Sequence, residues 1–212
     1  MDPVLPAVFG LFGGLFGLAA DRLAVRWPEH EGDGRRGVDW RTLALVVGGA
    51  AAFGALAVRW SQPAHLLVLG AYFAALLVLM ATDLDQKLLP DVITLPLIPV
   101  ALVVLLLGLN PLLEGKALAL PSALAAAIGA PLLLAVTDRV LRGALGMGDL
   151  KLAVGLGLMS GLSRLFTGFL IASALSSVVI VALLLTKRIR LDTAIPFGPV
   201  LIAGGIIAAL TQ

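Results

Sequence analysis

Long, mainly apolar stretches separated by short polar segments repeat along the whole chain of 212 residues. A helix that crosses a bilayer needs about 20 mainly apolar residues, and the polar breaks recur at about that interval. The pattern therefore predicts an all-α, polytopic membrane helix bundle of about eight transmembrane helices, folded as a single domain over residues 1–212. The predicted spans cover approximately residues 3–21, 42–59, 64–82, 92–109, 118–137, 150–163, 165–186 and 196–211.

The composition supports the membrane interpretation and excludes several kinds of site. Hydrophobic residues make up 60% of the chain and charged residues 13%, whereas soluble domains average roughly 45–50% and about 25%. The chain has no cysteine and two histidines, so a disulfide scaffold, thiolate catalysis and a Cys- or His-rich metal site are not expected. A net charge of +2 gives little reason to expect nucleic-acid binding, and neither a metal nor a cofactor is predicted.

The lysines and arginines predict which side of the membrane each loop faces. If the N-terminus is outside, twelve of them fall on the cytoplasmic side and three on the other, a clear positive-inside bias. Both termini are then extracytoplasmic, and the polar segment at about residues 22–41 is a short cytoplasmic loop. The three basic residues expected on the extracytoplasmic side are Arg59, Lys116 and Arg164.

Three aspartates lie around the end of the third predicted span, in the sequence TDLDQKLLPD. Asp83 falls in the last turn of the span and is the deepest of the three. Asp85 faces away from it and precedes a lysine by two residues, which favours an interfacial charge. Asp91 follows Pro90, where a carboxylate stabilises the first turn of the next helix. Because charged groups near the membrane core are costly and often functional, Asp83 is the best candidate for chemistry here.

A fourth aspartate, Asp149, opens the sixth predicted span after the glycine-rich sequence GALGMG. Gly146 and Gly148 keep the helix from starting early and let another backbone approach closely. The helix dipole and Lys151, two residues later, stabilise a carboxylate at this N-terminus. A plain N-cap on a membrane helix explains the same pattern, so the residues alone leave both roles open.

The predicted topology brings Asp83 and Asp149 to the same depth. The third span runs inward and ends at Asp83, whereas the sixth runs outward and begins at Asp149, so both lie at the cytoplasmic surface. Two aspartates in unequal surroundings suit aspartyl proteolysis, in which one carboxylate takes a proton from water and the other gives a proton to the scissile carbonyl. Two like charges held close together are not easily both ionised, which favours this division of roles.

Two other functions use the same pair of aspartates. The first is a proton- or cation-coupled transporter, since intramembrane carboxylates suit that use. Against it, both acids lie at one face rather than near the midplane, and the sequence has no inverted repeat. The second is a non-enzymatic assembly scaffold descended from a peptidase, and the presence of both aspartates argues against that alternative.

Three motifs together resemble a known family. TDLDQKLLPD before an apolar span, and GMGDLK opening another, resemble the two active-site segments of the bacterial type IV prepilin peptidases, which are GxGD-type intramembrane aspartyl proteases. The sequence IPFGP at residues 195–199 resembles the Pro-Phe-Gly-Pro stretch that opens the family's last span. The resemblance covers nearly the whole chain. It implies that Asp83 and Asp149 are catalytic and that Gly146 and Gly148 are the GxGD glycines.

The resemblance also implies a substrate and a place in the cell. The family cleaves a short basic leader from prepilins and pseudopilins, just before an apolar N-terminal helix, at the cytoplasmic face of the bacterial inner membrane. The expected partners are therefore such a substrate and membrane lipid, while the oligomeric state is open. Around the aspartates, we expect an active-site loop that includes Lys151, and positions with a substrate-binding or structural role at Asp85, Asp91, Pro196, Phe197 and Gly198.

One departure from the family concerns a second activity. Full-length members carry a larger cytoplasmic insert after the first span, often with paired cysteine motifs, and also methylate the new N-terminus using S-adenosylmethionine. Here the corresponding region shrinks to about residues 22–41 and has no cysteine, and no S-adenosylmethionine-binding fingerprint is found. We therefore expect a short, peptidase-only form.

Overall fold

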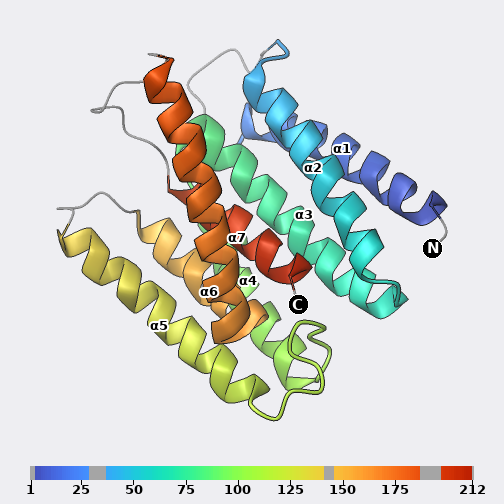
Figure 1. The fold of residues 1–212 in the computed structure, drawn as a ribbon, viewed down its shortest axis with the longest axis vertical. Coiled ribbons are helices and arrows are strands. Elements are labelled where there is room, and N and C mark those ends of the chain that lie inside the picture. Colours follow the sequence, from blue (N-terminus) through green and yellow to red (C-terminus); the bar gives the residue numbers. More distant parts are fainter. Residues whose placement is uncertain (1–2, 29–36, 141–145, 187–196, 212) are drawn as a thin grey trace.

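The computed structural model describes residues 3–28, 37–140, 146–186 and 197–211, and over these ranges all regular structure is helical. Five of the helices are long and apolar enough to cross a membrane, and two are shorter apolar helices. The predicted all-α polytopic bundle is thereby confirmed (Figure 1). The helices are α1 (Val4–Ala24), α2 (Trp40–Arg59), α3 (Pro63–Gln86), α4 (Asp91–Leu106), α5 (Ala119–Val140), α6 (Met147–Leu185) and α7 (Gly198–Leu210).

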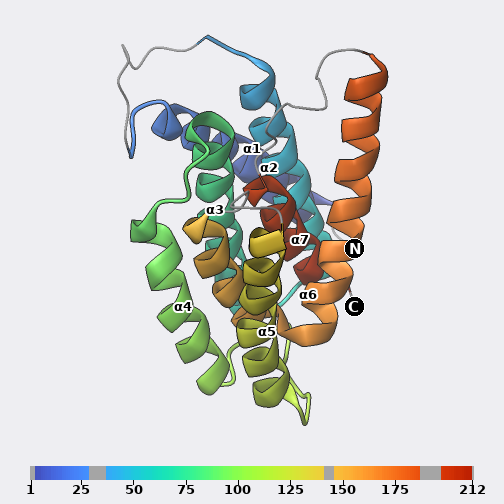
Figure 2. The same ribbon diagram turned by 90° about the vertical axis from the view of Figure 1, so that its left-hand side faces the viewer.

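The longest helix, α6, is two helices joined at Gly161. This residue has a non-helical backbone with φ 67° and ψ 175°, a left-handed conformation that glycine adopts without steric cost. The chain reverses direction there, so the second arm of α6 runs back along the bundle (Figures 1 and 2). The two arms correspond to the sixth and seventh predicted spans, at 150–163 and 165–186.

The bundle has two parts that meet mainly at α7. In the first part, α1, α2 and α3 contact one another. In the second part, α4 and α5 each contact α6. Helix α7 contacts members of both parts. In both views α7 lies between α3 and α6 (Figures 1 and 2). Because Asp83 belongs to α3 and Asp149 to α6, the candidate site is built from both parts of the bundle.

Glycines allow the closest helix contacts, as the small residues in the predicted spans indicate. Gly13 and Gly17 of α1 pack directly on the backbone of α2, where a Cβ on Gly17 would overlap the carbonyl group of Leu45. Gly157 in α6 packs in the same way on Ala127 of α5. These contacts let the helices approach at backbone distance, which larger side chains prevent.

Replacing Gly17 with Ala is expected to destabilise the chain by about 1–3 kcal/mol, since the added methyl group forces α1 away from α2. The measurement is thermal or denaturant unfolding of the purified protein in detergent. Gly48→Ala is the matched control, because a Cβ at Gly48 in α2 meets no atom within 4 Å. Equal stability of the two variants would contradict this close packing of α1 on α2.

The end of the bundle far from Asp83 holds the three basic residues Arg59, Lys116 and Arg164. Arg164 lies within electrostatic range of both Arg59 and Lys116. Arg164 also donates to the carbonyl oxygens of Ala208 and Thr211 at the end of α7. The structure therefore gathers at one end the residues that the charge pattern assigns to a single side.

Candidate active site

The end of α3 presents Asp83 to the interior. Asp83 is 5% exposed, although it lies only three positions before the helix ends at Gln86. Lys87 then takes a left-handed conformation, with φ 53°, and its N–H donates to the carbonyl oxygen of Asp83 at 2.9 Å. This turn ends α3 three residues after the aspartate, and in the segment that follows Leu89 packs against Gly148, next to Asp149.

Asp149 lies in the first turn of α6 and is 8% exposed. The helix begins at Met147, with Gly146 as its N-cap, so Asp149 is the third helical residue rather than the N-cap that the sequence allowed. Its Oδ2 accepts from the N–H of Gly146 at 3.0 Å, and its own N–H donates to the Gly146 carbonyl at 3.1 Å. This reciprocal pair fixes the carboxylate at the helix N-terminus.

The segment that follows α3 packs against the segment that opens α6. A Cβ on Gly148 would lie 2.8 Å from the Cβ of Leu89 and 3.4 Å from its carbonyl oxygen. Only a residue without a side chain permits this approach. The Leu89–Gly148 contact therefore joins the two aspartate-bearing segments, which lie far apart in the sequence.

The start of α7 packs against the other carboxylate. A Cβ on Gly198 would lie 2.5 Å from Oδ2 and 2.8 Å from Cγ of Asp83. The Asp83 Oδ2 atom is buried, and among the described residues it has no hydrogen-bond partner. Phe197 precedes Gly198, and its ring centroid lies 6.0 Å from that of Phe169 in α6. Pro196 lies outside the described residues.

The two carboxyl groups lie within electrostatic range of each other. Asp83 interacts with Asp149 and also with Lys87, whose charge has the opposite sign. The structure thus brings together two buried aspartates from α3 and α6, with the N-terminus of α7 against one of them. Among the described residues, no group of three or more His, Cys, Asp or Glu side chains that suits a metal ion is found.

Asp85 and Asp91 form ion pairs at the edge of this site. Asp85 accepts from Nη1 of Arg41 at 2.6 Å and joins the start of α2 to the end of α3. Asp91 accepts from Nζ of Lys151 at 2.6 and 2.8 Å and joins the start of α4 to the first turn of α6. Each pair fixes the position of a helix end that carries one of the two buried aspartates.

A third buried acid, which the sequence patterns did not single out, lies in α1. Asp21 is next to Arg22 but is fully buried, and its Oδ2 accepts from Oγ1 of Thr42 at 2.9 Å. Nearby, Nε2 of Gln86 donates to the carbonyl oxygens of Ala24 and Trp27 at 2.6 and 3.3 Å. These bonds anchor the end of α3 on α1. The available signal was the position of Asp21 four residues after Gly17, on the face of α1 that packs on α2.

The fold and the site define a class of protein: a multi-pass helical membrane protein with two buried aspartates at one end of the bundle. A family model described as the type IV leader peptidase family matches residues 70–182, which include both aspartates. The chain belongs to this family.

Curated relatives agree with the family assignment. The chain is 37% identical over 168 residues to a prepilin leader peptidase/N-methyltransferase of Burkholderia pseudomallei, covering 77% of this chain and 52% of the relative. It is 35% identical over 194 residues to a protein of the same name from Pseudomonas putida, covering 89% and 60%. A third such protein, from Bacillus subtilis, is 29% identical over 161 residues, covering 76% and 62%.

These matches cover most of this chain but a smaller share of each relative's length. The chain spans about half the length of the first curated relatives it matches. No solved structure matches the chain at a significant level.

Proposed function

We propose that this chain is an aspartyl endopeptidase of the bacterial inner membrane that removes the basic leader from prepilins or pseudopilins. Membership of the type IV leader peptidase family supports the reaction and the class of substrate. The single observation that carries the mechanism is the meeting of Asp83 and Asp149, both buried, at the junction of α3, α6 and α7. In this proposal residues 1–212 form one transmembrane domain, and the polar segment between α1 and α2 lies on the cytoplasmic side.

The surroundings of the two carboxylates differ, and this difference suits the reaction. Asp149 is held by the Gly146 N–H, whereas the Oδ2 atom of Asp83 is buried without a partner among the described residues. In the proposed mechanism the ionised aspartate removes a proton from water, and the resulting hydroxide attacks the scissile carbonyl carbon. The protonated aspartate gives its proton to the carbonyl oxygen. The aspartate that took the proton from water then gives it to the nitrogen as the C–N bond breaks. The other aspartate regains a proton from a hydroxyl group of the intermediate, so both carboxyl groups return to their starting states.

The active site faces the cytoplasm in this proposal. The basic residues Arg41, Lys87 and Lys151 lie at the end of the bundle that carries the aspartates, and lysine and arginine accumulate on the cytoplasmic side of membrane proteins. A prepilin presents its basic leader and the start of its apolar helix at that surface. Membrane lipid surrounds the remaining faces of the bundle.

The test is cleavage of a candidate prepilin by the purified chain in detergent or liposomes, with the products identified by mass spectrometry. We expect one cut, between the basic leader and the apolar segment. A transporter using the same aspartates would instead move protons or cations across liposomes and leave the prepilin whole. That result would contradict the proposal.

We further propose that the chain does not methylate the new N-terminus. The segment that connects α1 and α2, residues 25–39, is short and contains no cysteine. The relatives named above carry N-methyltransferase in their names, so the two activities are tested separately. Transfer of a labelled methyl group from S-adenosylmethionine to the cleaved pilin would overturn this part of the proposal.

A further inference from the structure

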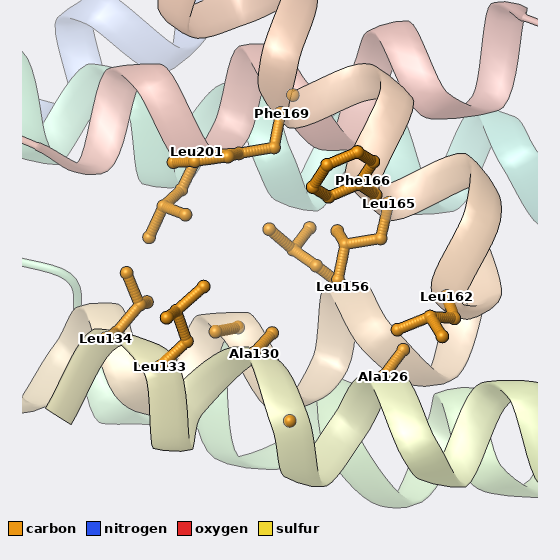
Figure 3. Close-up of a pocket in the computed structure, with 13 residues that line it drawn as sticks. Ala126, Ala130, Leu133, Leu134, Leu156, Leu162, Leu165, Phe166, Phe169 and Leu201 are labelled. Atoms are coloured by element: carbon orange, nitrogen blue, oxygen red, sulfur yellow. The ribbon is translucent and has the colours of Figure 1, made fainter. Parts of the chain in front are cut away.

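An apolar cavity of about 260 Å³ lies between α5, the two arms of α6 and α7 (Figure 3). All 13 residues that line it are alanine, glycine, leucine or phenylalanine. Leu133 and Ala130 project from α5 toward Leu156 in the first arm of α6, and Phe166 and Phe169 border the cavity from the second arm (Figure 3). The cavity therefore suits an apolar occupant and offers it no side-chain hydrogen bond.

The cavity begins next to the candidate active site. Ala153 and Leu156 line it and follow Asp149 by four and seven residues, on the same face of the first arm of α6. Leu201 lines it from α7 and follows Gly198 by three residues. Four residues of helix rise about 6 Å. The apolar space thus starts about one helical turn from the two aspartates, in the direction of the membrane interior.

The cavity is closed toward the core and open toward the outside. Ala153 and Leu156 are fully buried at its floor. At its rim, Leu133 is 64% exposed and Phe166 is 62% exposed. In a bilayer this outer surface contacts lipid, so an apolar segment that lies in the membrane can enter from the side.

We infer that this cavity binds the apolar side chains in the first turn of the substrate's hydrophobic segment, directly after the scissile bond. The inference rests on the proposed function, because the occupant is part of the prepilin. A cavity of about 150 Å³ holds one benzene molecule, so the space here takes one or two large side chains but not a helix. A lipid chain also fits apolar walls, but only a peptide cut at the aspartates must place apolar side chains one turn below them.

Gly129→Leu is the variant that fills the cavity. Gly129 lines it from α5, and a Cβ at this position meets no atom within 4 Å, so the new side chain fits without moving α5. We expect KM for an apolar-tailed prepilin to rise about tenfold with kcat retained, because the substrate loses burial of a large side chain. Gly48→Leu in α2 is the matched control, since that glycine is also exposed and open.

A second substrate separates a binding effect from a structural one. Replacing the large apolar residues in the first turn after the cut with Ala is expected to raise KM of the unaltered protein by a similar factor. With Gly129→Leu the same substitution has little further effect, because the cavity is already filled. Independent, additive losses in protein and substrate would overturn the inference.

Cross-linking provides a readout that needs no turnover. A photo-reactive phenylalanine derivative at Phe166, in the Asp149→Asn background, is expected to label the first turn of the apolar segment, whereas the same derivative at Phe12 in α1 is not. If the unaltered protein cuts no prepilin, the proposed function fails. If it cuts, but Gly129→Leu and Gly48→Leu have the same KM and Phe166 labels only phospholipid, the cavity is a lipid site and the inference is wrong.

Discussion

Asp83→Asn and Asp149→Asn are each expected to abolish leader cleavage while the chain remains folded and inserted. Asparagine keeps the shape of the side chain but neither takes nor gives the proton that the proposed mechanism requires. General acid–base catalysis contributes about 10²–10⁴-fold to a rate, and each variant removes one of the two groups that perform it. The measurement is the initial rate of prepilin cleavage by purified protein, with circular dichroism and gel filtration to establish folding.

Glu114→Gln is the control for this pair of variants. Glu114 lies at the other end of the bundle, where its Oε2 is 3.0 Å from Nε2 of His65, and its side chain is 58% exposed. We expect its cleavage rate to stay close to that of the unaltered protein. Full activity of either aspartate variant would exclude the aspartyl mechanism, and a strong loss in Glu114→Gln would contradict the assignment of that end to the far side of the membrane.

Gly198→Ala is expected to reduce kcat/KM by about 10²-fold, because a displacement of about 1 Å at a reacting group costs that much. The added methyl group would lie 2.5 Å from Oδ2 of Asp83 and 2.8 Å from its Cγ, so either the carboxylate or the start of α7 must move. Alanine is a good helix former, so the local helix is retained. The measurement is kcat and KM for leader cleavage.

Gly70→Ala in α3 is the matched control for Gly198→Ala. A Cβ at Gly70 makes an ordinary contact, 3.9 Å from Cε1 of Phe53, and α3 is also the helix that carries Asp83. We expect unchanged kinetics for this variant and similar thermal unfolding for both. If Gly198→Ala cleaves as fast as Gly70→Ala, the approach of α7 to Asp83 has no role in the reaction.

The apolar periodicity alone was enough to predict the helices. The reversal within α6 was also predicted, as a break between two spans near residue 164. The apolar run there is longer than one membrane crossing needs, so the chain has to turn back within it. The break in the structure is at Gly161, three residues earlier, where glycine accommodates the left-handed backbone. The motif spacing likewise singled out the two aspartates that the structure brings close together.

Contacts between distant segments could not be read from the same patterns. Nothing in the local sequence around Asp21 and Arg22 indicates burial, yet the packing of α1 on α2 buries Asp21 against Thr42. The ion pair between Arg41 and Asp85 joins residues 44 positions apart, a relation that no local periodicity contains. The same holds for Gly198 and Asp83, whose contact depends on how α7 packs between the two parts of the bundle.

The place of α7 between the two parts of the bundle has a mechanical consequence. Asp83 belongs to the α1–α3 part and Asp149 to the α4–α6 part, and these parts meet mainly at a short apolar helix of 13 residues. Membrane helices respond to bilayer thickness by tilting. If the two parts tilt relative to one another, the gap between the two carboxylates changes, and we therefore expect the rate of cleavage to depend on the thickness of the surrounding lipid.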